Sequence, residues 1–173
     1  MPTFPLRARP AESYREAPRA FGSARDGGQR QHAGCDLYAE AGAEVLAVED
    51  GQVIQGPYPF YDITAALEVR HPCGVVRYGE ISAEVMPGIH PGSAVTQGQV
   101  IAILADVGHG TARPNLPPML HFELYDGTAA GQLTDKTRPP FMRREDLQDP
   151  ADYLDTCTVS EPTEPPTVVE SEA

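Results

Sequence analysis

Short runs of alternating apolar and polar residues, separated by turn signals, are the feature that most constrains the fold of this chain. They recur in the stretches AEVLAVEDGQVIQG, TAALEVRH, GVVRYGEI, GSAVTQGQVIAIL and MLHFELYDG, with glycine, proline or Asp-Gly pairs between them. Alternation with a period of two is typical of strands that bury one face, and this spacing of turns favours antiparallel pairing. The sequence therefore predicts an all-β, antiparallel, sandwich-like core over residues 21–128, with weak helical periodicity only in 143–155.

The two ends of the chain differ in composition from this core. Residues 1–20 hold four prolines among scattered arginines and are expected to form an irregular arm. Residues 129–157 are expected to form an extension that packs on the core. Residues 158–173 contain four glutamates and no basic residue, so we expect a disordered acidic tail, because so little apolar surface cannot offset the entropy of ordering.

The charge of the chain argues against nucleic acid as a partner. The formal net charge is −12, and Lys136 is the single lysine, so a nucleic-acid partner is not expected, because phosphate binding needs a basic face. No apolar run approaches the length of a membrane span, and the N-terminus lacks the apolar segment of an export signal. Cys35, Cys73 and Cys157 are odd in number and widely separated, which favours reduced thiols over a disulfide framework.

Three residues suggest a metal site. His32 and Asp36 lie four residues apart just before the first strong strand pattern, and His121 lies inside the last one. Two neutral imidazoles and one carboxylate are a known ligand set for catalytic zinc, which keeps a fourth position open for water. Taken alone, however, an H-x-x-x-D pair is equally expected in a solvated loop, and a strand histidine can simply be a satisfied core residue.

The motifs around these residues favour a metal site over a solvated loop. The stretch HAGCDLYAEAGAEVLAVEDGQV, then VVRYGEIS and IHPGSAVTQGQVIAIL, and finally MLHFELYDG follow in order and spacing the motifs of a known family. Over residues 21–128 the chain resembles the LytM-type zinc metallopeptidases, also called the M23 or lysostaphin-like family. That resemblance implies a duplicated antiparallel β-fold and one Zn²⁺ ion held by His32, Asp36 and His121.

Two positions depart from the family pattern. The first histidine of the family's H-x-H pair is Met119 here, and the histidine expected after the middle tyrosine is Glu80. In one interpretation Glu80 serves as the general base in place of the histidine, since a carboxylate can accept a proton from water beside a dication. In the other interpretation the chain binds its ligand without cleaving it, because losing two acid–base groups costs about 10²- to 10⁴-fold in rate each.

Further residues are expected near the groove or around the ligands. Glu123 shares a strand face with His121 and is either an acceptor for a ligand imidazole or an outward polar residue. Cys35 lies between two proposed ligands but is expected to be a small buried side chain. The other candidates, as groove walls or hydrogen-bond donors, are Met119, Tyr78, His71, His109, Arg25 and Arg113.

The function implied by the resemblance is hydrolysis of peptide bonds in the stem or cross-bridge of peptidoglycan. The alternative is an inactive module that binds peptidoglycan or regulates a partner, and the extension 129–157 could dock a protein partner. With no export signal visible, we expect synthesis in the cytoplasm and delivery to the cell wall by a phage, lysis or injection apparatus. A lipoyl- or biotinyl-carrier role is disfavoured because Lys136 lies outside the two half-motifs that would flank a modified lysine.

Overall fold

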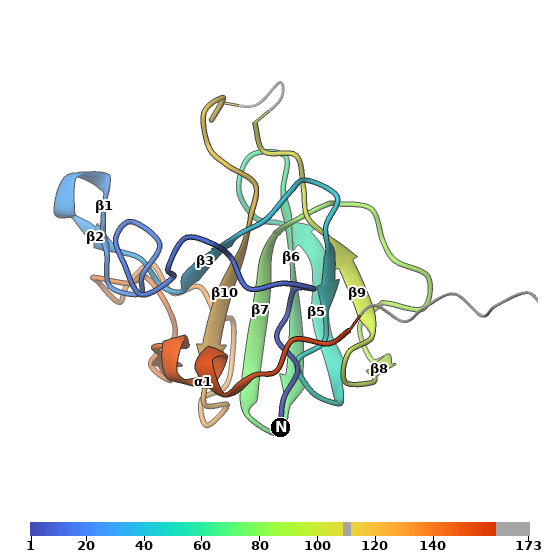
Figure 1. Cartoon of the computed structure of the whole chain (residues 1–173). Helices are drawn as coiled ribbons and strands as arrows, with labels where there is room; N and C mark the ends of the chain where they lie inside the picture. The colour runs from blue at the N-terminus through green and yellow to red at the C-terminus, as the bar shows by residue number, and fades with distance from the viewer. Residues whose placement is uncertain (109–111, 162–173) are drawn as a thin grey trace, which may run out of the picture.

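The computed structural model describes residues 1–108 and 112–161 and consists mainly of antiparallel β-structure (Figure 1). Its longer strands are joined by tight turns, and the described residues form one 3-10 turn, η1 (Asp26–Gly28), and one short helix, α1 (Ala151–Thr156). The strands are β1 (Ala24–Arg25), β2 (Arg30–Gln31), β3 (Cys35–Tyr38), β4 (Glu44–Leu46), β5 (Gly51–Pro59), β6 (Ala65–His71), β7 (Gly74–Ile81), β8 (Ala94–Val95), β9 (Val100–Ile103), β10 (Met119–Tyr125) and β11 (Leu147–Gln148).

One seven-stranded sheet forms the body of the molecule. Its order is β11-β10-β7-β6-β5-β8, and β3 shares with β11 the edge of β10 that faces away from β7. Strands β4 and β9 pair separately, and β1 and β2 form a small hairpin that projects at one side (Figure 1). The predicted all-β antiparallel fold is confirmed, and α1 is shorter than the helical periodicity in 143–155 suggested.

Residues of β10 alternate between two buried faces of the sheet. In β10, Leu120, Phe122 and Leu124 enter the main hydrophobic core, while His121 and Glu123 point to the opposite face. All seven residues of β10 are nevertheless buried. The second face is therefore covered, although it carries polar and charged side chains.

The cover on this second face comes from the chain that follows β10. Leu133 and Leu147 pack on Val75 and Tyr125 in a small second cluster. Arg143 reaches from the same segment to Glu123. The segment expected as a C-terminal extension thus contacts the strand that carries His121.

The N-terminal segment contributes to the main core without forming a regular strand. Phe4, Leu6 and Tyr14 are buried there. The Thr3 amide donates to the Val48 carbonyl at 2.8 Å, which fixes the start of this segment beside the body of the molecule. The expected acidic tail lies largely outside the described residues, which end at residue 161.

No helix among the described residues has the length and apolar character needed to cross a membrane.

Removal of the Phe122 ring should test whether the main core holds β10, the strand that carries His121, in place. Phe122 is fully buried and meets Tyr78 edge to face, with 5.7 Å between ring centroids. We expect Phe122→Ala to lower the free energy of unfolding by about 3–5 kcal/mol, because it leaves a cavity. Val85 is exposed, so Val85→Ala should change the stability by less than about 0.5 kcal/mol. Urea unfolding measures both, and equal effects of the two changes would contradict this packing.

Candidate metal centre

Three side chains from separate segments converge on the second face of the sheet. His32 directly follows β2, Asp36 lies in β3, and His121 lies in β10. Asp36 and His121 are direct partners in the β3–β10 register, so their side chains stand side by side on one face. His32 then has to reach the same point from the turn that precedes β3.

Gly34 allows that turn to pass close to β10. A Cβ atom at this position would lie 2.3 Å from the carbonyl oxygen of Phe122, far closer than any side chain tolerates. Only glycine lets the backbone come this near, and the close approach brings His32 over His121. The central glycine of the His32–Asp36 motif therefore has a steric reason.

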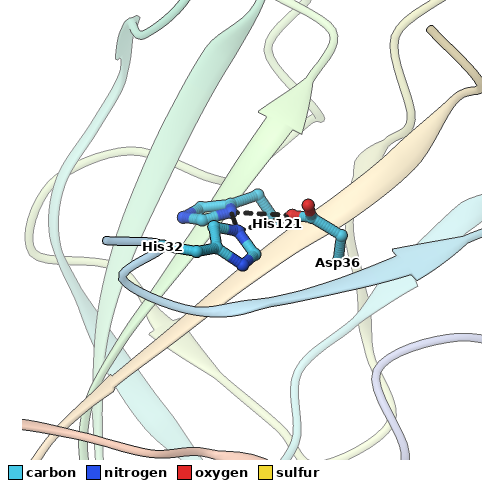
Figure 2. Close-up of side chains that lie close together, drawn as sticks. All are labelled: His32, Asp36 and His121. Atoms are coloured by element: carbon cyan, nitrogen blue, oxygen red, sulfur yellow. Dashed lines mark hydrogen bonds and ion pairs between the residues drawn. The ribbon is translucent and has the colours of Figure 1, made fainter. Parts of the chain in front are cut away.

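The three side chains meet at one point (Figure 2). His32 Nε2 lies 3.0 Å from His121 Nδ1 and 3.0 Å from Asp36 Oδ1, and His121 Nδ1 lies 2.9 Å from the same oxygen. All three residues are buried. Among the described residues they are the one group of histidine, cysteine and acidic side chains arranged so that a metal ion could bind.

Hydrogen bonds on the far side of each ring assign the tautomers. His32 Nδ1 donates to the Ala20 carbonyl oxygen at 3.0 Å, so Nε2 has its lone pair free toward the shared point. His121 Nε2 donates to Glu123 Oε1 at 2.9 Å, which leaves Nδ1 as the atom facing the shared point. Both imidazoles are therefore oriented for coordination by partners that are not ligands themselves.

Glu123 holds the second histidine through a buried network. Its side chain is fully buried, and Arg143 Nε donates to Oε1 at 2.9 Å while Arg77 Nη1 donates to Oε2 at 3.0 Å. Burial raises the pKa of this carboxyl, but the charges of Arg77 and Arg143 outweigh it and hold the pKa well below its usual range. The carboxylate is thus kept ionised where His121 needs an acceptor.

The electrostatics of the cluster favour a cation. Burial lowers the pKa of His121, but its bonds to Asp36 and Glu123 outweigh burial and raise the pKa to about 9. Burial alone pushes the Asp36 pKa up, yet the two histidines bring it below its usual value. Without a metal, a proton on His121 supplies the positive charge that two carboxylates demand. A dication would replace that proton, and two nitrogens with one carboxylate oxygen are a donor set that fits zinc.

Arg25 approaches the other oxygen of Asp36, with 3.2 Å between Nη2 and Oδ2. The Asp36 carboxylate therefore has one oxygen held by a guanidinium. The other is turned to the point where it meets His32 Nε2 and His121 Nδ1, called the metal point below. The contact with Arg25 fixes the rotation of the carboxylate.

A groove opens from the three residues to solvent. It has a volume of about 510 Å³, and Glu80, Met119, Arg113 and Tyr61 line it together with the candidate ligands. Arg25, predicted as a groove residue, lines it as well. Glu80 and Met119, the two positions expected to replace family histidines, thus face the same space as the candidate ligands.

Glu80 sits in an unusual backbone conformation. The β6–β7 register passes from Ala65 with Ile81 to Ala66 with Gly79, so Glu80 has no cross-strand partner and forms a bulge. Its φ is +62°, a left-handed conformation that side chains other than glycine rarely adopt. Arg113 donates two hydrogen bonds to the Glu80 carboxylate, from Nη1 to Oε1 at 2.8 Å and from Nη2 to Oε2 at 3.1 Å. The bulge and the ion pair together aim Glu80 into the groove.

Two other predicted candidates lie elsewhere. His71 ends β6 at the turn to β7, and its Nε2 bonds to the Tyr78 hydroxyl at 2.9 Å inside the core. The metal point lies opposite Gly79, five residues along β7 from the Gly74 that pairs with His71, or about 16 Å away. Neither His71 nor Tyr78 lines the groove. His109 lies outside the described residues.

Cys35 is not a ligand in this arrangement. Its side chain belongs to the main core on the face opposite Asp36, and burial raises the pKa of the thiol to about 12. The prediction of a small buried side chain is confirmed. The alternation of β3 separates it from the ligands.

Several residues that shape the site were not predicted from the sequence. Arg77 could have been found, because alternation along GVVRYGEI places it on the face of the sheet that carries Glu123. Arg143 carries no comparable signal, since it arrives from a loop distant in the sequence. The Ala20 carbonyl that orients His32 is a backbone group and leaves no trace in the sequence.

Comparison with known proteins agrees with this geometry. The model of peptidase family M23 matches residues 30–134, which is more than half of the chain. The chain belongs to peptidase family M23. A comparison with curated proteins found no match.

Solved structures show the M23 fold at low sequence identity. The catalytic domain of the antimicrobial peptidase lysostaphin from Staphylococcus simulans matches with a TM-score of 0.56 and 19% identity, covering 79% of this chain and 90% of that domain. LytU matches with a TM-score of 0.58 and 18% identity, covering 86% of this chain and 92% of that one. Lysostaphin itself gives a TM-score of 0.58 at 18% identity over 96% of this chain and 59% of its own length. These likenesses concern the fold.

Zinc binding tests the assignment of the cluster. We expect the protein to bind one zinc ion and to melt at a higher temperature with it, because an ion that binds only the folded state stabilises that state. His32→Ala and Asp36→Asn should each abolish stoichiometric binding. His90 is exposed and lies outside the groove, so His90→Ala should bind like the unaltered protein. Calorimetry and metal analysis measure this, and full zinc content in the His32→Ala protein would refute the site.

Glu123 offers a test of how the second histidine is oriented. Glu123→Gln should weaken zinc binding by about 10- to 100-fold, because His121 loses its charged acceptor. Glu68→Gln is the matched control, since Glu68 is a buried acid that also contacts Arg77, at 3.4 Å, but not His121. Competition with a chelator gives both affinities. If the Glu123→Gln protein is folded and binds zinc normally, the orienting role is wrong.

Proposed function

We propose that this M23 domain is a zinc metalloendopeptidase that cleaves peptide bonds of peptidoglycan. The observation that carries the proposal is the convergence of His32 Nε2, His121 Nδ1 and Asp36 Oδ1 beside an open groove. The other ring nitrogen of each histidine is fixed by a hydrogen bond. Membership of family M23 and the fold shared with lysostaphin support the same reaction class.

Zinc bound at this point would supply an activated water and polarise the scissile carbonyl. The chain's own contribution is to present three ligands and leave one side open to the groove, so that a peptide can approach. Glu123, through His121, and Arg25, through Asp36, keep these ligands in place.

Glu80 is the proposed general base. Its carboxylate lines the groove, and the bulge at this position turns it toward the space that the substrate would occupy. A carboxylate there can take a proton from the attacking water and pass it to the leaving amine. Arg113 fixes the orientation of Glu80 by its two-point contact, and Met119 forms an apolar wall beside it.

The same contact favours a second candidate function. Both carboxylate oxygens of Glu80 accept hydrogen bonds from Arg113, so the base is engaged before any substrate arrives. A domain in which this ion pair never opens would bind peptidoglycan peptides through the groove and cleave none. The chain would then be a binding or regulatory module.

Digestion of purified peptidoglycan separates the two functions. We expect zinc-loaded protein to release muropeptides with new amine ends, detected by mass spectrometry, and metal-stripped protein to release none. Glu80→Gln should lower the rate by about 10²- to 10⁴-fold, because the proton acceptor is lost. Glu84→Gln is the control, since Glu84 is exposed and outside the groove.

The outcomes assign the role of each part. A Glu80→Gln protein with the full rate would remove Glu80 as the base while leaving the peptidase intact. If protein of confirmed zinc content releases nothing from peptidoglycans of several cross-link types, the peptidase proposal fails. The binding module then becomes the better account.

A further inference from the structure

A second hollow adjoins the metal groove. It also has a volume of about 510 Å³ and shares Arg30, Tyr61 and Arg143 with the groove, so the two spaces adjoin. One wall comes from the end of β5 and the residues after it, and the opposite wall comes from residues 134–143. Neither the metal site nor the proposed base uses this hollow.

The charge of its lining sets the hollow apart from the rest of the molecule. Arg30, Lys136 and Arg143 line it, and no carboxylate does, although the chain as a whole has a net charge of −12. A space lined by three cations and no acid can receive an anion, although Arg30 and Arg143 each have a carboxylate partner outside the lining. The single lysine of the chain is one of the three.

Two of these cations have N–H donors that form no hydrogen bond with the described residues. Lys136 is exposed and makes no hydrogen bond or ion pair with any residue that the structure describes. The neighbouring Asp135 does not neutralise it, because its carboxylate is held by Arg138 at 3.1 Å and by Thr137. Arg30 uses Nε toward Asp26 at 3.0 Å, and within the described residues its two Nη nitrogens have no partner.

Arg143 is already committed to the network behind the metal point. Its Nε donates to Glu123 and its Nη1 to the Met142 carbonyl oxygen, and the side chain is buried. It therefore contributes charge to the hollow rather than a flexible contact. Arg30 and Lys136 are the groups that can close on a ligand.

Tyr61 reports the potential where the hollow meets the groove. Burial raises the pKa of its hydroxyl, but Arg143 and Arg30 outweigh burial, and the pKa falls below its usual value. A buried phenol whose pKa falls lies in a positive potential. Arg30 and Arg143 line both spaces together with Tyr61, which places positive charge where the groove meets the hollow.

The remaining wall is aromatic. Tyr58, Phe60 and Tyr61 line one side, and the Tyr58 hydroxyl is occupied by its bond to Glu68. Ring surfaces suit the apolar stem of a ligand, while the cations suit an anionic end. A carboxylate on a short carbon chain or at a peptide terminus has both parts, and arginine binds such a group with two parallel hydrogen bonds.

We propose that this hollow binds a carboxylate of the substrate peptide, held by Arg30 and Lys136, while the scissile bond lies in the adjoining metal groove. The inference rests on the proposed function for its reaction, and it adds that the preferred substrate is an acidic peptide. It also gives the segment after β10 a role, since residues 134–143 supply one wall of the specificity site. The carboxylate has two possible sources, a chain terminus or an acidic side chain.

Four versions of one synthetic peptide test this inference. The terminal carboxylate is free or amidated, and the acidic side chain is a carboxylate or a carboxamide. Binding to the zinc-loaded Glu80→Gln protein is measured by calorimetry, and KM and kcat are measured with the zinc-loaded unaltered protein. We expect removal of the relevant carboxylate to weaken binding and raise KM by about tenfold or more, since a charged hydrogen-bonded contact is lost. The arm that shows the effect identifies the source.

Variants assign the effect to the hollow. Lys136→Gln and Arg30→Gln should bind acid and amide peptides almost equally, while their zinc content stays normal. Arg70→Gln is the matched control, because Arg70 is an exposed cation of β6 that lies outside the hollow. This control should keep the full preference for the acid.

The two proposals fail in different ways. Equal affinity for all four peptides, or an acid preference that survives both Lys136→Gln and Arg30→Gln, would overturn the carboxylate site even if cleavage is normal. An acid preference in binding without any cleavage would overturn the peptidase and leave the carboxylate site standing.

Discussion

The buried carboxylate of Glu123 is the interaction on which the site depends. It accepts from His121, Arg77 and Arg143, so one fully buried side chain links the candidate ligand, the neighbouring strand and the segment after β10. A buried charge is costly unless it is paired, and removing one partner of a buried ion pair typically costs about 3–5 kcal/mol. Arg77 and Arg143 meet this requirement, and they keep a negative charge behind His121 without competing for the metal point. The segment that carries Arg143 is therefore as much part of the site as β10 itself.

The chemistry of the groove follows from this arrangement. Asp36 and His121 lie side by side on the sheet and His32 joins them from the turn before β3, whereas Glu80 is oriented by a bulge and held by an arginine from a loop. Strand register therefore fixes two of the candidate ligands, and the proposed base is fixed by an ion pair that substrate binding can loosen. Arg30, Arg143 and Lys136 give the hollow beside the groove a positive lining within an acidic protein. Such a contrast guides anionic ligands to one place on the surface.

Part of this architecture could be read from the sequence, because it depends on local pattern. Alternation with a period of two identified the strands, and it placed Glu123 on the face of His121 and Cys35 on the face opposite Asp36. The H-x-G-x-D spacing marked His32 and Asp36, and Gly34 shows why glycine stands between them. Distant contacts left no such signal. The pairing of Arg113 with Glu80 and the closing of the hollow by Lys136 depend on how loops fold back onto the sheet. His71 and Tyr78 were expected near the groove from residue type alone, but His71 lies at the far end of β6, Tyr78 belongs to the main core, and neither lines the groove.

Anomalous diffraction at the zinc absorption edge, on crystals of the zinc-loaded protein, tests the central claim most directly. The account predicts a single strong peak bonded to His32 Nε2, His121 Nδ1 and an oxygen of Asp36, at about 2.0–2.2 Å, with the remaining position open to the groove. A peak at other side chains, or a fourth protein ligand that closes the site, would contradict it.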